Sequence, residues 1–375
     1  MRGLLRYVFG KRGQRRLRGW RMIYRLRTEV LLRTRNPITG ISHFPRTRLW
    51  VDKEMFPRIQ KLLLNAQHTV VIQMFIWKDD RLGRQMASIL LQVADRGVKV
   101  YIYKEAVGDV FEFTKDFLST QDATEGLWQR FWHHPNIRIT HEKRVDHAKV
   151  YIIDDKILLL TGTNIADEYH DRLHDYMVEL HGSQFVDDYL THGDQQQPRN
   201  DARVRLCMNS EFRKDIRPVV MDLIENARHS VVLEQCYFAD SRVTDALVKK
   251  SHEGVHITLI IPERTELAHH HANMHTASRL ITECAAGNIQ VFLFPRMFHG
   301  KSMLVDRTSA FIGSVNFFTS SLDDMGEVNV LLTGKNDESI QKLREVLRNE
   351  ILVSRPLTSP PRFHWIGKLL GWLKL

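Results

Sequence analysis

The sequence predicts an α/β protein that contains two tandem copies of one folding unit. The residues NAQHTVVI at 65–72 return as NARHSVVL at 226–233, and RGVKV at 96–100 returns as EGVHI at 253–257. Helical and strand patterns alternate within each copy, which is typical of a sheet covered by helices. We therefore expect two α/β sandwich units related by a pseudo-twofold axis.

Each copy has the same expected order of elements: helix, strand, helix, strand, an insertion of variable length, and a β-hairpin. The distance between equivalent residues falls from 161 at position 65 to 157 at position 96 and 152 at the hairpin, which indicates loop deletions in the second copy. The insertion of the first copy, 107–132, is rich in aromatic residues. Packing in a core or lid is the preferred interpretation of these residues, and a role facing a membrane or an acyl chain is left open.

The hairpin contains the most specific repeat. Its first copy is HAKVYIID at 147–154, with Asn164 ten residues after the Asp, and its second is HGKSMLVD at 299–306, with Asn316 at the same spacing. Residues i and i+2 of a strand point to one face, so each His projects together with its Lys. The Asp begins a tight turn, and the returning strand brings a Gly-containing segment and the Asn back beside them. This duplication predicts a symmetric phosphodiester site between the two units.

Residues of these types can catalyse attack on a phosphodiester without a metal ion. A neutral imidazole is a nucleophile near pH 7, and a protonated imidazole can donate to the leaving oxygen. Two Lys and two Asn side chains can bind the phosphoryl oxygens. We therefore expect no cofactor and no metal. A second cluster, His269-His270-His271 with His275, has an i, i+4 pair that could bind a metal, but contact with a lipid headgroup is the preferred interpretation.

The duplicated motif resembles that of the phospholipase D superfamily, H-x-K-x4-D-x6-G-S-x-N. The second copy matches at every position, whereas Thr161 and Gly162 replace the usual Gly and Ser of the first copy. The resemblance implies a covalent phosphohistidine, with His147 as nucleophile and His299 as acid and base, or the reverse. The implied catalytic set is His147, Lys149, Asp154, His299, Lys301 and Asp306, in which the two Asp residues hold the hairpins. The implied substrate-binding set is Gly162, Asn164, Glu179, Gly313, Ser314, Asn316 and Glu327, in which the two Glu residues orient the imidazoles.

Short stretches outside the motif resemble the cardiolipin synthase branch, namely QMFIW at 73–77, NIADEY at 164–169 and PRMFH at 295–299. This resemblance implies a phosphatidyltransferase that joins two phosphatidylglycerol molecules and releases glycerol. The number of phosphodiester bonds is then unchanged, so no nucleotide is needed. Three alternatives stay open: a phospholipase D-type hydrolase with water as acceptor, a nuclease, and an inactive membrane scaffold, which the two intact motifs disfavour.

The net charge of +10 is concentrated at the two ends of the chain. Residues 1–37 contain twelve Lys or Arg and one acid, and residues 355–375 contain four and none, so the region between them is acidic. This pattern argues against nucleic acid as a partner and favours two basic anchors on an anionic membrane. We expect a basic amphipathic anchor at 1–44, units at 45–200 and 201–354, and a Pro-rich linker with an amphipathic helix at 355–375.

Attachment to the membrane is expected to be peripheral or monotopic. No stretch reaches the roughly 18 to 20 apolar residues that a span requires, whereas Trp365, Leu369 and Trp372 form a helical stripe suited to the headgroup region. The bacterial inner membrane is the expected location, and the Arg-rich start also fits a mitochondrial protein. The three cysteines form no disulfide framework, and the oligomeric state is left open.

Overall fold

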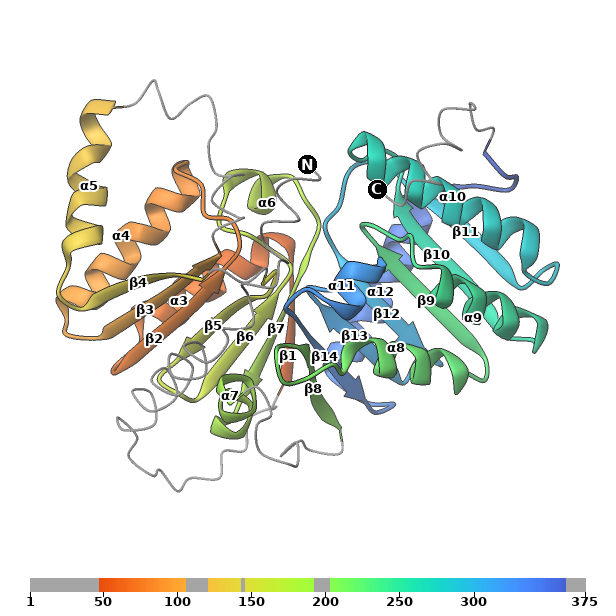
Figure 1. Ribbon diagram of the computed structural model, residues 1–375, viewed down its shortest axis with the longest axis horizontal. Coiled ribbons are helices and arrows are strands. Elements are labelled where there is room, and N and C mark those ends of the chain that lie inside the picture. The colour runs from red at the N-terminus through yellow and green to blue at the C-terminus, as the bar shows by residue number, and fades with distance from the viewer. Residues whose placement is uncertain (1–46, 106–120, 143–145, 192–202, 362–375) are drawn as a thin grey trace, which may run out of the picture. The chain divides into compact units, whose positions relative to one another are not determined.

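The first half of the chain forms a seven-stranded mixed sheet (Figure 1). The computed structural model describes residues 47–105, 121–142, 146–191 and 203–361. In sheet order the strands are β1 (Thr47–Val51), β7 (Tyr176–His181), β6 (Ile157–Thr161), β5 (Lys149–Ile153), β2 (Thr69–Met74), β3 (Lys99–Glu105) and β4 (Ile137–Glu142). Strands β2, β3 and β4 are parallel, and the other neighbours are antiparallel.

The second half repeats this arrangement in an eight-stranded sheet. In the matching order the strands are β8 (Val204–Asn209), β14 (Glu327–Thr333), β13 (Ser309–Gly313), β12 (Lys301–Val305), β9 (Ser230–Gln235), β10 (His256–Pro262), β11 (Ile289–Phe294) and β15 (Arg355–Pro356). Every strand of the first sheet therefore has a counterpart at the same position, and β15 is an addition at one edge. The predicted pair of α/β units is confirmed.

Helices flank both sheets, and several of them also occur in equivalent pairs. The first half contains η1 (Asp52–Glu54), α3 (Met55–Leu64), α4 (Arg81–Asp95), α5 (Gln121–His133), α6 (Asp167–Asp171) and α7 (Ser183–Leu190). The second contains α8 (Ile216–Glu225), α9 (Ser241–His252), α10 (Leu267–Glu283), α11 (Thr319–Asp323) and α12 (Glu338–Val353). The carboxylates of Asp80 and Asp240 cap α4 and α9 by accepting from the backbone N–H of Gly83 and Val243, which satisfies donors that the first helical turn leaves unpaired.

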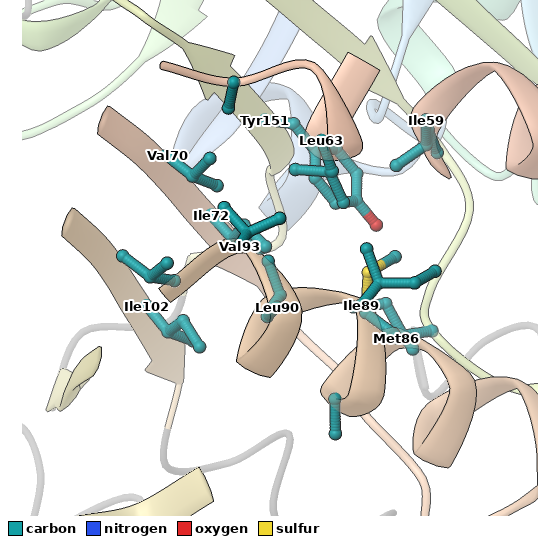
Figure 2. Packing of buried hydrophobic residues seen from close by; sticks show 14 of the residues in the cluster. Ile59, Leu63, Val70, Ile72, Met86, Ile89, Leu90, Val93, Ile102 and Tyr151 are labelled. Atoms are coloured by element: carbon teal, nitrogen blue, oxygen red, sulfur yellow. The ribbon is translucent and has the colours of Figure 1, made fainter. Parts of the chain in front are cut away.

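A hydrophobic core fixes α3 and α4 against the first sheet (Figure 2). Residues of α3, α4, β2, β3 and β5 meet there, and those labelled in the figure are Ile59, Leu63, Val70, Ile72, Met86, Ile89, Leu90, Val93, Ile102 and Tyr151. Tyr151 belongs to β5, the strand that begins at the motif lysine Lys149. Burial of apolar surface therefore also fixes the strand that presents the first His–Lys pair.

The insertion before each motif hairpin forms a further helix and strand, α5 with β4 and α10 with β11. Phe131 is 2% exposed and packs edge-on against Trp77 and Trp128, and Trp128 Nε1 donates to Asp79 Oδ1 at 2.9 Å. Core packing is thus confirmed for Phe131 and Trp128, whereas Trp132 of the same helix is 50% exposed. Phe111, Phe113 and Phe117 of the same insertion lie outside the described residues.

The two expected anchors, at 1–44 and from 362 onward, also lie outside the described residues. Within the part that is described, no helix has both the length and the apolar character needed to cross a bilayer. Cys207, Cys236 and Cys284 are buried free thiols.

Candidate active site

The motif hairpins turn through two residues in the left-handed region. Asp154 and Asp155 have φ of 52° and 53°, and Asp306 and Arg307 have φ of 49° and 60°, as in the hairpin turns that need positive φ at both central positions. The Asp154 carboxylate accepts from the backbone N–H groups of residues 67, 68 and 69 at 2.7–3.1 Å. Asp306 contacts residues 228–230 in the same way. Both Asp residues therefore hold the hairpin against the preceding loop, and we exclude them from the groups that carry out chemistry.

The motif lysines are buried beside their histidines. Lys149 is fully buried, and its Nζ donates to the carbonyl oxygen of His147 at 2.6 Å. Lys301 is 1% exposed, and its Nζ donates to the carbonyl oxygen of His299. The predicted projection of each Lys with its His is thus confirmed.

The carboxylate that faces each motif imidazole comes from the other half of the chain, and we call this arrangement the exchange of carboxylates. His147 Nδ1 lies 3.2 Å from Glu327 Oε2, at the start of β14, and His299 Nδ1 lies 2.8 Å from Asp175 Oδ2, just before β7. The backbone repeats the exchange, because His147 N donates to Gly326 O at 2.7 Å and His299 N donates to His174 O at 2.8 Å. Each histidine is therefore oriented by the other half of the chain. We call His147, Lys149, Asn164 and Glu327 the His147 half-site, and His299, Lys301, Asn316 and Asp175 the His299 half-site.

Glu179 does not orient an imidazole of the motif, which corrects the expectation from the sequence. Its buried carboxylate accepts hydrogen bonds from Arg58 at 2.6 and 2.8 Å and from Trp50 Nε1 at 2.7 Å, and it lies 2.6 Å from His181 Nε2. The residue that faces His299 is Asp175. It precedes Glu327 by 152 residues, the offset that also relates the two histidines and the two asparagines, so the repeat itself contained the signal.

Gly162, Gly313 and Ser314 pack against the strands and carboxylates behind the imidazoles, and their expected contact with substrate stays a prediction. A Cβ on Gly313 would lie 2.3 Å from Val328 O, and one on Gly162 would lie 2.5 Å from Asp175 Oδ1. Gly313 therefore packs closely on the backbone of β14, and Gly162 packs closely on the Asp175 carboxylate. The hydroxyl of Ser314 donates to Glu327 Oε2 at 2.5 Å.

The two motif asparagines differ in their contacts. Asn164 Oδ1 accepts from the backbone N–H of Ile76 at 3.1 Å, and the same side chain hydrogen-bonds to Tyr169. Asn316 Oδ1 is buried and, within the described residues, accepts no hydrogen bond. Leaving a buried polar atom unpaired costs about 1–3 kcal/mol, so Asn316 retains hydrogen-bonding capacity for a ligand.

Burial and the lysine charges keep both imidazoles neutral. Burial, followed by the charge of Lys149, lowers the pKa of His147, and burial, followed by the charge of Lys301, lowers the pKa of His299 to about 3. The charge of the lysine in the other motif also lowers the pKa of each histidine. The two half-sites therefore share one electrostatic environment. Burial lowers the pKa of Lys149 to about 7.

One aromatic ring contacts each imidazole edge-on. The Phe75 ring lies 5.1 Å from His147, centroid to centroid, and the Tyr169 ring lies 5.2 Å from His299. Phe75 belongs to the segment 73–77 and Tyr169 to the segment 164–169, the two stretches outside the motif that resemble the cardiolipin synthase branch. Both stretches thus contribute directly to the surroundings of the histidines.

Comparison with protein families matches this repeated arrangement. The family model described as the PLD-like domain of cardiolipin synthase matches residues 59–195 and 220–351, one copy in each half. The chain belongs to this family. It is accordingly an enzyme of the phospholipase D type, and the resemblance recognised in the motif is confirmed.

Members of the cardiolipin synthase family resemble the chain over most of its length. Cardiolipin synthase B of Escherichia coli K12 is 26% identical over 331 residues, which cover 80% of this chain and 78% of that protein. The probable cardiolipin synthase YwiE of Bacillus subtilis is 24% identical over 349 residues, 84% of this chain and 67% of that protein. The crystal structure of phosphatidylserine synthase from Haemophilus influenzae has the same fold, with a TM-score of 0.68, 12% identity and coverage of 88% and 92%.

Beyond the family motif, the His-rich stretch lies on α10. His269 stacks on Tyr237 with ring centroids 4.0 Å apart. Within the described ranges, the side chains with the spacing of a metal site are instead His174, Glu234 and Glu350, whose nitrogen and oxygen atoms lie within 4.8 Å of one another. None of the α10 histidines belongs to that group.

Proposed function

We propose that the chain is a membrane-surface phosphatidyltransferase that joins two phosphatidylglycerol molecules into cardiolipin and releases glycerol. The observation that supports this proposal most strongly is the exchange of carboxylates, which gives each buried histidine an acid partner from the other half. Two equivalent imidazoles are what a two-step displacement at phosphorus requires, one as nucleophile and one as acid and base.

In the first step, His147 Nε2 attacks the phosphorus of one phosphatidylglycerol. The N–P bond forms, the bond from phosphorus to the headgroup glycerol oxygen breaks, and His299 gives a proton to that oxygen. We assign the acid–base role to His299 because its contact with Asp175, at 2.8 Å, is shorter than the 3.2 Å contact of His147 with Glu327. A closer carboxylate stabilises the protonated imidazole better.

In the second step, a hydroxyl of the second phosphatidylglycerol attacks the phosphohistidine. His299 takes the hydroxyl proton, the O–P bond forms and the N–P bond breaks, which restores both histidines. Lys149, Lys301, Asn164 and Asn316 hold the phosphoryl oxygens through both steps. The same sequence with water as the acceptor would give phosphatidic acid, so the acceptor alone distinguishes the transferase from a hydrolase.

Substrate binding itself would prepare His299 as the acid. Burial and the Lys301 charge lower the pKa of His299, and a phosphodiester anion placed between the two lysines opposes the effect of that charge. The bound substrate therefore favours protonation of the imidazole beside the leaving oxygen.

Membrane attachment through both ends would place the site where lipid acceptors are concentrated. The basic segment 1–37 and the Trp- and Lys-containing segment 362–375 suit an anionic surface. A bacterial inner membrane is the location that we propose.

The test is to supply the purified full chain with vesicles of phosphatidylglycerol alone and to analyse the products by mass spectrometry. We expect cardiolipin and free glycerol in equal amounts, and no reaction with the His147→Ala variant. Exposed His256 provides the matched control, since its replacement with Ala removes a histidine from a strand of the second sheet. Phosphatidic acid as the only lipid product, also with added alcohols, would establish the hydrolase instead.

A further inference from the structure

A group of ionisable side chains, all buried except the 41% exposed Asp52, lies next to the His299 half-site and takes no part in the proposed chemistry. We call it the His174 cluster: His174 with the carboxylates of Asp52, Glu234 and Glu350. His174 Nδ1 lies 2.7 Å from Asp52 Oδ1, and its Nε2 lies 2.8 Å from Glu350 Oε1 and 3.4 Å from Glu234 Oε1. The cluster brings together η1, the segment before β7, β9 and α12, and hence both halves of the chain.

Because water is largely excluded from His174, Glu234 and Glu350, the negative charge of the carboxylates must be balanced within the cluster. His174 and Glu350 are 5% exposed, and Glu234 is fully buried. Among the residues that the structure describes, the other polar contacts of the Glu234 carboxylate are to hydroxyls, because Tyr176 and Ser302 both donate to Oε2, the latter at 3.2 Å. Two buried carboxylates beside one buried imidazole are stable only if a positive charge lies among them.

Protonation of His174 meets this requirement. Burial alone would lower the pKa of His174, but the charges of Glu234 and Glu350 and the hydrogen bond to Asp52 raise it well above its ordinary value. Burial, followed by the charge of Glu350, raises the pKa of Glu234 to about 8, and the charge of His174 opposes this rise.

The cluster is connected directly to the two residues that form the His299 pair. The carbonyl oxygen of His174 accepts from His299 N at 2.8 Å, and the next residue, Asp175, accepts from His299 Nδ1. On the other side, Gly300 lies so close to Glu234 that an added Cβ would be 2.5 Å from its Oε1. The segments on either side of the Asp175–His299 contact are therefore both fixed to the cluster.

We propose that His174, as an imidazolium, is a positioning residue for His299: it draws Asp52, Glu234 and Glu350 onto the segment before Asp175 and so fixes the Asp175–His299 pair for proton transfer. This inference rests on the proposed function, because it presupposes that His299 moves a proton during the reaction.

A divalent cation is the competing occupant, since one nitrogen and two carboxylate oxygens converge in the cluster. The distances favour the proton. Two ligand atoms at about 2.0–2.1 Å in a tetrahedral site are about 3.4 Å apart, whereas His174 Nε2 and Glu350 Oε1 are 2.8 Å apart, a separation typical of a charge-assisted contact.

The kinetic test compares His174→Gln with His174→Arg in the full-length enzyme. The neutral variant should lower kcat by about 10- to 100-fold, as expected when catalytic groups are misplaced by about 1 Å, with KM nearly unchanged. Arg keeps the charge, and the cavity of about 670 Å³ that His174 lines offers room for it, so His174→Arg should recover most of the loss. His181→Gln is the matched control, because it removes another His–Glu pair in the same half, at 2.6 Å, and should leave kcat unchanged.

Two further measurements keep the proposal testable if His174→Gln folds poorly. Adding Glu350→Gln to that variant removes the carboxylate left without its counter-charge and should restore the melting temperature. In the wild-type enzyme, the ¹⁵N resonances of the His174 ring should show the doubly protonated form at pH 7.

Full activity of a folded His174→Gln, a neutral His174 ring at pH 7, or one equivalent of tightly bound divalent metal that is lost in Glu350→Gln would each overturn the proposal. The state of the ring and the metal content do not depend on turnover. A wild-type enzyme that is inactive on every phospholipid would therefore reject the proposed function separately.

Discussion

The two half-sites have the same sequence motif but support their carboxylates differently. In the His147 half-site, Glu327 is long enough to reach the imidazole from β14, and the hydroxyls of Ser314 and Ser321 each donate to it at 2.5 Å. In the His299 half-site, the carboxylate is the shorter Asp175, which accepts from the backbone N–H of Tyr176 at 2.8 Å. Gly162 occupies the position equivalent to Ser314.

This difference explains why the first motif departs from the family pattern at Gly162. The missing side chain leaves the space that the Asp175 carboxylate occupies, since a Cβ there would contact both of its oxygens at 2.5 and 2.6 Å. Gly162 with Asp175 and Ser314 with Glu327 are thus two solutions to one requirement, a fixed carboxylate behind an imidazole. A motif residue is interpretable only together with the residue it packs against.

The largest expected effect comes from removing either imidazole. Replacing His147 or His299 with Ala should lower kcat by on the order of 10³-fold or more, because the two groups have separate roles in both steps. Initial rates of glycerol release would measure this, with His256→Ala as the control. If one of the two variants kept more than a tenth of the activity, the half-sites would not be equivalent partners and the two-histidine mechanism would be wrong.

The next largest effect is expected on the pH dependence of kcat/KM, to which Lys149 of the His147 half-site contributes. Because the pKa of Lys149 is lowered to about 7, this phosphate ligand loses its charge as the pH rises through 7, and kcat/KM should fall above that pH. In Lys149→Arg the guanidinium stays charged, so this fall should move to higher pH even though the rate itself drops by about 10²-fold. Lys156→Arg, in the exposed hairpin turn, should leave the profile unchanged, and an identical profile for Lys149→Arg would exclude Lys149 as its origin.

An exchange of the supporting residues tests the comparison directly. Gly162→Ser alone should overpack against Asp175 and lower kcat about 10-fold. Combining it with Asp175→Glu recreates the pair of the other half-site and should recover part of the loss, which a double-mutant cycle would measure. The reciprocal pair, Ser314→Gly with Glu327→Asp, serves as the matched control. Simple additivity of the two changes in the His299 half-site would show that Gly162 and Asp175 are not coupled.

The smallest effect on activity is expected at Glu179. Arg58 and the other donors, acting against burial, lower its pKa to about 2, so the stabilisation is present above pH 4.5, the ordinary pKa, and is lost as the pH falls through 2. Glu179→Gln should lower the free energy of unfolding by about 3 kcal/mol at pH 7 and leave the kcat of the folded enzyme unchanged. Urea denaturation at pH 7 and pH 3 would show this difference shrinking in acid. A large loss of kcat without a loss of stability would show instead that Glu179 contributes to catalysis.

The sequence by itself determined the duplicated unit and the reacting groups. The spacing His147-x-Lys149 and the equal offset of 152 residues between the copies depend only on local strand geometry and on duplication, so both were predictable. The α/β class and the tight turns at Asp154 and Asp306 followed for the same reason.

Only the tertiary structure decided which carboxylate serves which histidine. The contacts of His147 with Glu327 and of His299 with Asp175 join residues 180 and 124 positions apart and cross between the two halves. Their partners depend on how two sheets pack, which no local pattern encodes. Glu179 was therefore misassigned, because as a carboxylate on the right strand it satisfied the local pattern, while packing directs it to Arg58.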